Sequence, residues 1–329
     1  MSERYLITGG QGFIGGWIAR QLLAEGCEVA LFDLRPDDHL LEQILNADDF
    51  AKLERHFGDI ADTETVKRLI HESSPTAVIH LAGLQVPTCR AQPILGARVN
   101  VVGTLNVFEA VRELMEATKK PLNVVYASSA AVIGSPEDYS GPIEDDDHHR
   151  PRTHYGVFKT ANEGNARVYW NDHGIPSVGL RPYTVYGVGR EIGITSGPTK
   201  ALKAVILGRE FTIPFSGKTV FDFVEDVASY FVACARIELN GAHACNIRGH
   251  IVDLSDYVGI VEEVLPGAAQ AIHIEGGPLP LAVDLVDSNL RSLIGEPKLT
   301  ALRDGVQRTV DHFLKLKSEG RLHDRDLDG

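Results

Sequence analysis

The sequence predicts an α/β protein built on a doubly wound parallel sheet, and two patterns support this prediction. Short apolar segments typical of buried strands alternate with amphipathic helical segments through the first half of the chain. Glycines also gather where the first strand meets the first helix, in the segment YLITGGQGFIGGWIARQLL at residues 5–23. Parallel sheets of this kind bind ligands beyond the carboxyl ends of their strands, so we expect the functional residues just after each strand.

The individual elements follow from periodicity. Buried strands are predicted at residues 4–8, 27–33, 52–60, 76–83, 122–129 and 177–183. The helices predicted between them occupy residues 13–25, 62–72, 99–115 and 155–173. After Gly187 the alternation weakens, and helices are predicted only at residues 200–207, 226–237 and 255–265. Such an alternation of strands and helices indicates right-handed crossovers that cover both faces of the sheet.

Composition excludes several classes of partner. The chain has 329 residues and a formal net charge of −13, which argues against nucleic acid or an anionic membrane as a partner. No run of 18 uncharged apolar residues predicts a membrane span, and the first strand begins too early to leave room for a signal peptide. The four cysteines are far apart, as is typical of reduced thiols in a cytoplasmic protein. We therefore expect a small-molecule partner.

Acidic residues and histidines cluster between Glu144 and His154, which raises the question of a metal site. This segment lies between the predicted strand at 122–129 and the predicted helix at 155–173. We interpret it as a solvated loop and predict no metal.

The glycine-rich segment predicts a dinucleotide-binding loop of Rossmann type. Gly9, Gly12 and Gly15 are spaced G-x-x-G-x-x-G: the first permits the tight turn, the second lets a pyrophosphate approach the backbone, and the third lets helix pack on strand. The second strand ends at Asp33, where a carboxylate can accept a hydrogen bond from the adenosine ribose 2′-hydroxyl. A carboxylate there repels a 2′-phosphate, so NAD is favoured over NADP, although Arg35 follows closely.

A second pattern predicts proton transfer. Tyr155 and Lys159 are four residues apart on a predicted helix and hence share one face. The unperturbed pKa of tyrosine is about 10, and a neighbouring ammonium is expected to lower it. Tyr155 would then take a proton from a substrate hydroxyl while hydride leaves the same carbon for NAD. Ser129, at the end of the strand VVYASS, is placed to hold the same hydroxyl.

With these motifs the sequence resembles the extended short-chain dehydrogenase/reductase family, in its NAD-dependent epimerase/dehydratase group that includes UDP-galactose 4-epimerase. The likeness covers nearly the whole chain and rests on the segments TGGQGFIG, GDI, HLAG, VNVVGTLNVFEA, ASSAAVIG, THYGVFKTANE and RPYTVYGVGR. It implies Ser129, Tyr155 and Lys159 as catalytic residues, and a homodimer. The residues that it places at NAD are Gly9, Gly12, Phe13, Ile14, Gly15, Asp33, Asp59, Ile60, Leu81, Ala82, Gly83, Asn100, Tyr155, Lys159, Tyr183 and Val185.

The organisation expected on this basis has three parts. Residues 1–187 form the NAD-binding Rossmann domain that carries the serine, tyrosine and lysine. Residues 188–317 form most of a smaller substrate-binding lobe, interleaved with the first part. Residues 318–329 form a polar tail that we expect to be frayed.

Departures from the family pattern bear on the substrate. Ala130 and Ala131 follow Ser129, where dehydratases and decarboxylases of the group carry an acid, so those reactions are disfavoured. Nucleotide-sugar members hold the diphosphate with an asparagine, which is Thr184 here, and with an arginine, which aligns with Thr219. The segment at residues 276–287 has no arginine either. A diphosphate would then need Arg190 or Lys200 as a substitute.

Two enzymatic functions remain open. The favoured one is an NAD-dependent dehydrogenase of a small sugar, sugar acid or related hydroxy compound, whose substrate contacts we expect to be Gln85, Ser129, Arg190 and Thr195. The alternative is a nucleotide-sugar 4-epimerase that keeps its NAD tightly bound. An intact Ser129, Tyr155 and Lys159 disfavour a non-catalytic NAD-binding protein.

Overall fold

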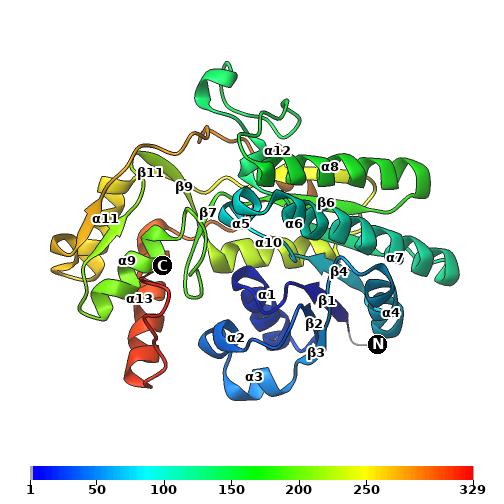
Figure 1. The fold of residues 1–329 in the computed structure, drawn as a ribbon, viewed down its shortest axis with the longest axis horizontal. Helices are drawn as coiled ribbons and strands as arrows, with labels where there is room; N and C mark the ends of the chain where they lie inside the picture. The colour runs from blue at the N-terminus through cyan, green and yellow to red at the C-terminus, as the bar shows by residue number, and fades with distance from the viewer. Residues whose placement is uncertain (1–2, 329) are drawn as a thin grey trace.

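A seven-stranded parallel sheet organises the structure, a computed structural model that describes residues 3–328 (Figure 1). Its strands are ordered β10-β6-β5-β4-β1-β2-β3. Their bounds are β1 Arg4–Thr8, β2 Glu28–Asp33, β3 Glu54–Phe57, β4 Ala77–His80, β5 Asn123–Ala127, β6 Ser177–Arg181 and β10 Ala242–Asn246. The chain runs outward from β1 to β3 and then returns to β4 on the other side of β1, which creates a switch point there. The predicted doubly wound α/β fold is confirmed.

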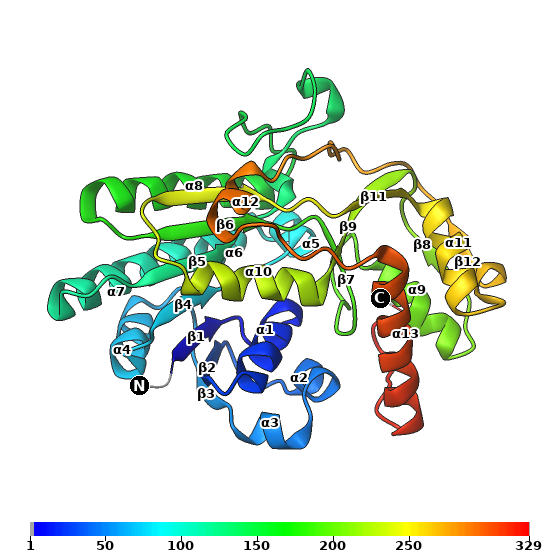
Figure 2. The same cartoon turned by 180° about the vertical axis from the view of Figure 1, so that it is seen from behind.

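Helices cover both faces of this sheet because alternate residues of each strand point to opposite sides. In β1, Leu6 packs in one apolar core and Tyr5 and Ile7 pack in the other. One face is covered by α4 (Thr63–Ser73), α7 (Gly103–Thr118) and α8 (His154–His173), and the other by α1 (Phe13–Ala24) and α10 (Val224–Arg236) (Figures 1 and 2). The two cores therefore fix the plane of the sheet and the positions of its strand ends.

The chain beyond residue 187 returns to the main sheet. Strand β10 pairs in parallel with β6, and α10 packs against α1, β4 and β5. Helix α12 (Ser288–Ile294) then packs against β10 and α10. The second half of the chain thus supplies an edge strand and two helices to the layers that the first half begins.

The rest of the second half forms a smaller lobe at one end of the sheet (Figures 1 and 2). It contains a three-stranded sheet ordered β11-β9-β7 and a two-stranded sheet of β12 and β8. The strand bounds are β7 Thr184–Tyr186, β8 Phe211–Ile213, β9 Lys218–Phe223, β11 His250–Asp253 and β12 Ile272–Ile274. The helices of the lobe are α9 Gly197–Ile206, α11 Leu254–Val264 and α13 Leu302–Ser318. The sequence patterns did not predict α13 or any of these strands, because each strand is short and several are polar on one side.

Several short helices also escape prediction from periodicity. They are α2 (His39–Ile44), α3 (Ala47–Ala51), α5 (Val86–Ala91) and α6 (Pro93–Ala97). The helix predicted at 99–115 is part of a longer continuous helix, residues 93–118, with a π-helical segment, η1 (Arg98–Val102), near its N-terminal end. Within residues 3–328, this is the one helix long and apolar enough to cross a membrane by length and composition. Half of its most apolar window is buried inside the protein, where α7 packs against α4 and α8.

Two polar segments differ from expectation. The loop at Glu144–His154 is anchored, because the buried Asp145 accepts hydrogen bonds from the backbone N–H groups of Asn246 and Asn289. The expected frayed tail is held in place through its described residues: Asp326 pairs with the buried Lys203 on α9, and Asp328 pairs with Arg209. Contacts with distant segments, which periodicity cannot show, explain both differences.

Candidate active site

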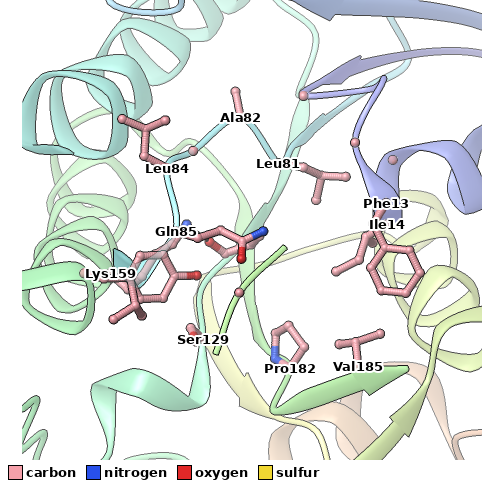
Figure 3. Close-up of a pocket in the computed structure, with 18 of the residues that line it drawn as sticks. Phe13, Ile14, Leu81, Ala82, Leu84, Gln85, Ser129, Lys159, Pro182 and Val185 are labelled. Carbon is pink, nitrogen blue, oxygen red and sulfur yellow. Dashed lines mark hydrogen bonds between the residues drawn. The ribbon is translucent and has the colours of Figure 1, made fainter. Parts of the chain in front are cut away.

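A cavity of about 470 Å³ opens at the carboxyl ends of the sheet strands (Figure 3). Figure 3 shows Phe13 and Ile14 of α1 on one side of it, and Gln85, Ser129 and Lys159 on the other. The predicted residues that line it are Gly9, Gly12, Phe13, Ile14, Gly15, Asp33, Asp59, Ile60, Leu81, Ala82, Gly83, Gln85, Ser129, Tyr155, Lys159, Tyr183, Val185, Arg190 and Thr195. The site thus has a cofactor end, at the glycine loop, and a substrate end, around Tyr155 and Arg190.

The glycine loop leaves room that side chains would fill. Gly9 has φ +68°, and a Cβ there would lie 2.7 Å from the backbone nitrogen of Ala82. A Cβ at Gly15 would lie 2.7 Å from the carbonyl oxygen of Gly9. The N-cap of α1 is Gly12, so no side chain caps the first N–H groups of the helix. Open N–H groups at the start of a 12-residue helix fit a pyrophosphate.

At the end of β2, Asp33 is fixed in orientation by backbone donors. The N–H groups of Gln11 and Leu34 donate to its two carboxylate oxygens over 3.1 and 2.8 Å. Burial raises the pKa of Asp33, and these hydrogen bonds oppose that effect. Arg35 lies outside the cavity lining, and its carbonyl accepts a hydrogen bond from Gln11. This arrangement fits a ribose with a free 2′-hydroxyl and hence NAD.

Asn100 stays a predicted cofactor contact, and its side chain faces the loop after β4. It is buried in η1 and does not line the cavity. Its amide instead forms two hydrogen bonds with the backbone of Leu84, of 2.7 Å from the Leu84 N–H and 2.9 Å to the Leu84 carbonyl. The π-helical turn directs the side chain at the loop after β4. Asn100 therefore shapes the segment that carries Gly83 and Gln85.

Helix α8 is held firmly beneath the substrate end. Its N-cap Thr153 accepts a hydrogen bond from the N–H of Gly156, whose own Cβ, if present, would lie 2.1 Å from the Ala131 carbonyl. Two turns along the helix, the buried Glu163 accepts two hydrogen bonds from Arg181, of 2.9 and 2.7 Å. Although burial opposes ionisation, Arg181 holds the pKa of Glu163 below its usual value. The pair fixes the face of the helix that also carries Tyr155 and Lys159.

The structure brings the serine, tyrosine and lysine together. Tyr155 and Ser129 both line the cavity, and the ammonium of Lys159 lies 5.5 Å from the centre of the Tyr155 ring. Lys159 Nζ donates to the Ala127 carbonyl over 2.6 Å. Beneath them the buried His80 bridges Thr8 and Thr104 through its two ring nitrogens.

The electrostatics of this trio differ from the sequence-based expectation. Burial raises the pKa of Tyr155, while Ser129 and the charge of Arg190 act in the opposite direction. Burial also lowers the pKa of Lys159 to about 8. The sequence predicts Lys159 as the cation that favours the phenolate, and the charge of Arg190 acts in the same direction. Lys159 also faces the Ala127 carbonyl at the base of the site.

At the substrate end, the two positions where nucleotide-sugar members carry diphosphate-binding side chains do not line the cavity. Thr184 and Thr219 are fully buried and hydrogen bonded to each other over 2.7 Å. Lys200 also lies outside the lining, near the ring of Phe211. Among residues 3–328, the basic side chains that line the cavity are Lys159 and Arg190, and the acidic ones are Asp33 and Asp59.

Sequence reasoning missed some lining residues of the site. They are Phe32, Leu34, Gly58, Leu84, Val86, Val99, Ala127, Ser128, Ala130, Ala131, Pro182, Gly193, Ile194 and Leu281. Most adjoin a predicted residue, so proximity in the chain could have found them. Leu281 has no such signal: it comes from a segment nearly 100 residues away and reaches the site because its carbonyl accepts from the Tyr183 hydroxyl. Within the described chain, no group of three metal-ligating side chains is found.

Comparisons with known proteins agree with this geometry. The chain is 30% identical to CDP-paratose 2-epimerase of Salmonella typhi and 30% identical to UDP-glucose 4-epimerase of Mycolicibacterium smegmatis, in each case over 94% of this chain and 98% of the relative. The crystal structure of Thermus thermophilus UDP-glucose 4-epimerase with NAD superposes with a TM-score of 0.77 at 28% identity, over 94% of this chain and 98% of that one. A family model described as "NAD dependent epimerase/dehydratase family" matches residues 5–247. The chain therefore belongs to this NAD-dependent epimerase/dehydratase family of extended short-chain dehydrogenases/reductases.

Proposed function

We propose that this chain is an NAD-dependent dehydrogenase that oxidises a hydroxyl group of a small substrate without a nucleotide. The observation that carries the proposal is the buried Thr184–Thr219 pair, which occupies the two positions expected to bind a diphosphate. Two phosphates need several cationic or backbone donors. Arg190 is the single cation at the substrate end besides Lys159, within the described residues.

In the proposed mechanism, Ser129 and Tyr155 bind the reacting hydroxyl. Tyr155, as the phenolate, takes the hydroxyl proton and becomes the neutral phenol, and the protonated Lys159 stabilises the phenolate before this transfer. When bound, NAD accepts the hydride from the carbinol carbon. The glycine loop, Asp33 and the strand ends would hold the dinucleotide, and Tyr155 lies in the same cavity. No carboxylate lines the substrate end among residues 3–328, which supports oxidation over elimination of water or CO₂.

Residues 188–317 supply the substrate-binding lobe in this proposal. Arg190, Thr195 and Leu281 line the cavity from that part of the chain, and Tyr183 lines it from the short connection between β6 and β7. The proposed lobe is interleaved with residues 1–187, since β10 and α10 lie in the main sheet layers.

The second candidate is a nucleotide-sugar epimerase, and the relatives named above favour it. In that reaction the transient ketone rotates within the site, and the reduced cofactor returns the hydride to the opposite face of the ketone. A dehydrogenase releases NADH in each cycle, whereas an epimerase retains it.

The deciding experiment follows NADH absorbance near 340 nm with purified protein, added NAD and a panel of free sugars, sugar acids, polyols and UDP-sugars. Multiple turnovers with a free compound would establish the dehydrogenase. Copurified NAD, no net NADH and isomerised UDP-sugar would establish the epimerase instead. Tyr155→Phe is the matched control, because it removes the proton acceptor in both cases and leaves the cofactor end intact.

We also propose a cytoplasmic homodimer that associates through the neighbouring helices α7 and α8. The apolar side chains of Val157 and Val168 are 48% and 55% exposed on α8, and Val102, at the start of α7, is 41% exposed. Exposed apolar side chains gathered on one face are typical of an interface. Light scattering should report a dimer for the wild type and a monomer for Val157→Glu/Val168→Glu. A monomeric wild type would refute this assembly.

A further inference from the structure

Arg190 is a half-buried cation that lines the cavity, and its charge has no ionic partner among residues 3–328. Its Nη2 donates to the Thr195 hydroxyl over 2.9 Å, and its Nε is buried without a hydrogen-bond partner. No acidic side chain of residues 3–328 forms an ion pair with it, and burial lowers its pKa. A guanidinium offers five N–H donors, and burying them unpaired is costly. Such a group is typical of a site that binds an anionic ligand.

The surroundings of Arg190 offer further donors. Gly193 has φ +111°, and a Cβ there would lie 2.4 Å from Gln85 Oε1 and 3.2 Å from Arg190 Nη2. A glycine is thus required for the backbone to approach both side chains. Gln85 carries an amide NH₂, and Thr195 carries a hydroxyl. Asp33 and Asp59, the carboxylates of the lining, belong to the cofactor end, so the substrate end is rich in donors and poor in negative charge.

The position of Arg190 relates this charge to the reacting hydroxyl. The electrostatic influence of Arg190 reaches Tyr155, whose pKa it lowers against the effect of burial. The guanidinium also lies 5.9 Å from the ring centre of Phe13, near the glycine loop. Two anions could therefore reach it in principle: a substrate carboxylate, or the pyrophosphate of the dinucleotide. The Thr195 bond and the influence on Tyr155 both favour the substrate.

We propose that Arg190, assisted by Thr195 and Gln85, binds the carboxylate of the substrate, which makes the substrate a hydroxy acid. This inference rests on the proposed dehydrogenase function and specifies its substrate class. A carboxylate has two coplanar oxygens that match the guanidinium fork, and its single charge matches the single free cation. A nucleoside diphosphate would bring more negative charge than these residues can pair.

The test compares hydroxy acids with neutral analogues of the same carbon skeleton, such as gluconate with its amide and with sorbitol, and glycerate with glycerol. The wild type is expected to oxidise acids and to discriminate against the neutral partners. Arg190→Gln should lower kcat/KM for acids by about 100-fold, the loss typical of a charge-assisted bidentate contact. The loss for neutral analogues should be much smaller, because they lose only the effect of Arg190 on the pKa of Tyr155. Arg190→Lys should fall in between, because it keeps the charge and loses the fork.

Control measurements separate the two anions. The Kd for NAD, measured by calorimetry, should be the same in Arg190→Gln and the wild type. If the Kd for NAD weakens as much as kcat/KM for acids, Arg190 holds the pyrophosphate and the proposal is wrong. Arg90→Gln removes an exposed positive charge outside the cavity lining and controls for long-range attraction of anions. A thermal melt of Arg190→Gln excludes unfolding as the cause of lost activity.

A binding measurement distinguishes failure of this inference from failure of the proposed function. Gluconate and glycerate are titrated into protein with NADH, and the cofactor fluorescence is followed. If the wild type binds these acids without oxidising them, and Arg190→Gln does not bind them, the carboxylate site is supported and the dehydrogenase is refuted. Oxidation of acids and neutral compounds alike, at rates that Arg190→Gln does not lower for the acids, would support the dehydrogenase and refute the carboxylate site. If the wild type neither binds nor oxidises any of the acids, the carboxylate site is also refuted.

Discussion

The cofactor end and the substrate end of the cavity are built by different means. At the cofactor end the backbone makes the contacts: glycines clear space, the N-terminus of α1 presents N–H groups, and Asp33 is oriented by backbone donors. At the substrate end the side chains of Gln85, Tyr155 and Arg190 come from well-separated segments of the chain. Backbone sites leave compact sequence patterns, whereas side-chain sites depend on tertiary placement. The difference explains why the cofactor was easier to predict than the substrate.

The largest expected effect separates chemistry from cofactor binding. Tyr155→Phe should lower kcat by about 10²- to 10⁴-fold, the usual contribution of a positioned acid or base. The Kd for NAD should not change, because the glycine loop and Asp33 remain intact. Steady-state rates and calorimetry on the same preparation check this, and wild-type turnover in the variant would contradict the proposed role.

A second prediction concerns the free energy of unfolding, which the buried ammonium of Lys159 lowers. Lys159 is buried, and its pKa is lowered to about 8, so its ammonium destabilises the fold below that pH. Lys159→Met should abolish activity and raise the free energy of unfolding at pH 7 by about 1–3 kcal/mol. The unfolded lysine keeps its proton to higher pH than the folded one, so the difference should shrink between pH 8 and pH 10. Urea denaturation of both proteins across this range measures it, and a variant less stable than the wild type at pH 7 would refute it.

A substitution at Gly9 tests whether a bare backbone is needed at the cofactor end of the cavity. Gly9→Ala places a Cβ 2.7 Å from the Ala82 nitrogen and should weaken NAD binding by roughly tenfold or more, equivalent to about 1.4 kcal/mol. Gly26→Ala is the matched control: it has a similar positive φ of +80°, but nothing lies within 4 Å of its added Cβ. Equal Kd values for NAD in the two variants would show that close approach is not needed at Gly9.

The smallest expected effect concerns the loop that carries Arg190. Glu191, next to it, pairs with the buried Lys203, which also pairs with Asp326 of the tail. Asp326→Asn should raise KM for the substrate about two- to threefold, the size expected for loss of one partly buried ion pair, with kcat and NAD binding unchanged. Asp328→Asn breaks the exposed pair with Arg209 and is the control, expected to match the wild type. Equal KM values in both variants would mean that the tail does not position this loop.

Much of the fold was predictable, because strands buried on both faces and amphipathic helices produce strong periodic signals. The seven-stranded sheet nevertheless gained β10, whose sequence AHACN has no such signal and which is specified by pairing with β6. In the site, the hydrogen bonds of Asn100 to Leu84 could not be predicted, since the π-helical turn around Asn100 is not visible in spacing. The partner of Thr184 was equally hidden, because only the folded sheet brings Thr219 beside it.

The pairing of β10 with β6 also sets an order of events during synthesis. Strand β6 ends at residue 181 and its edge partner ends at residue 246, so 65 further residues are translated before the sheet is complete. At 5–20 residues per second this takes roughly 3 to 13 s. For that time the nascent chain presents an apolar strand with an unpaired edge, which is a template for aggregation. The emerging polypeptide is therefore most in need of a chaperone when the ribosome has passed β6 and not yet released β10.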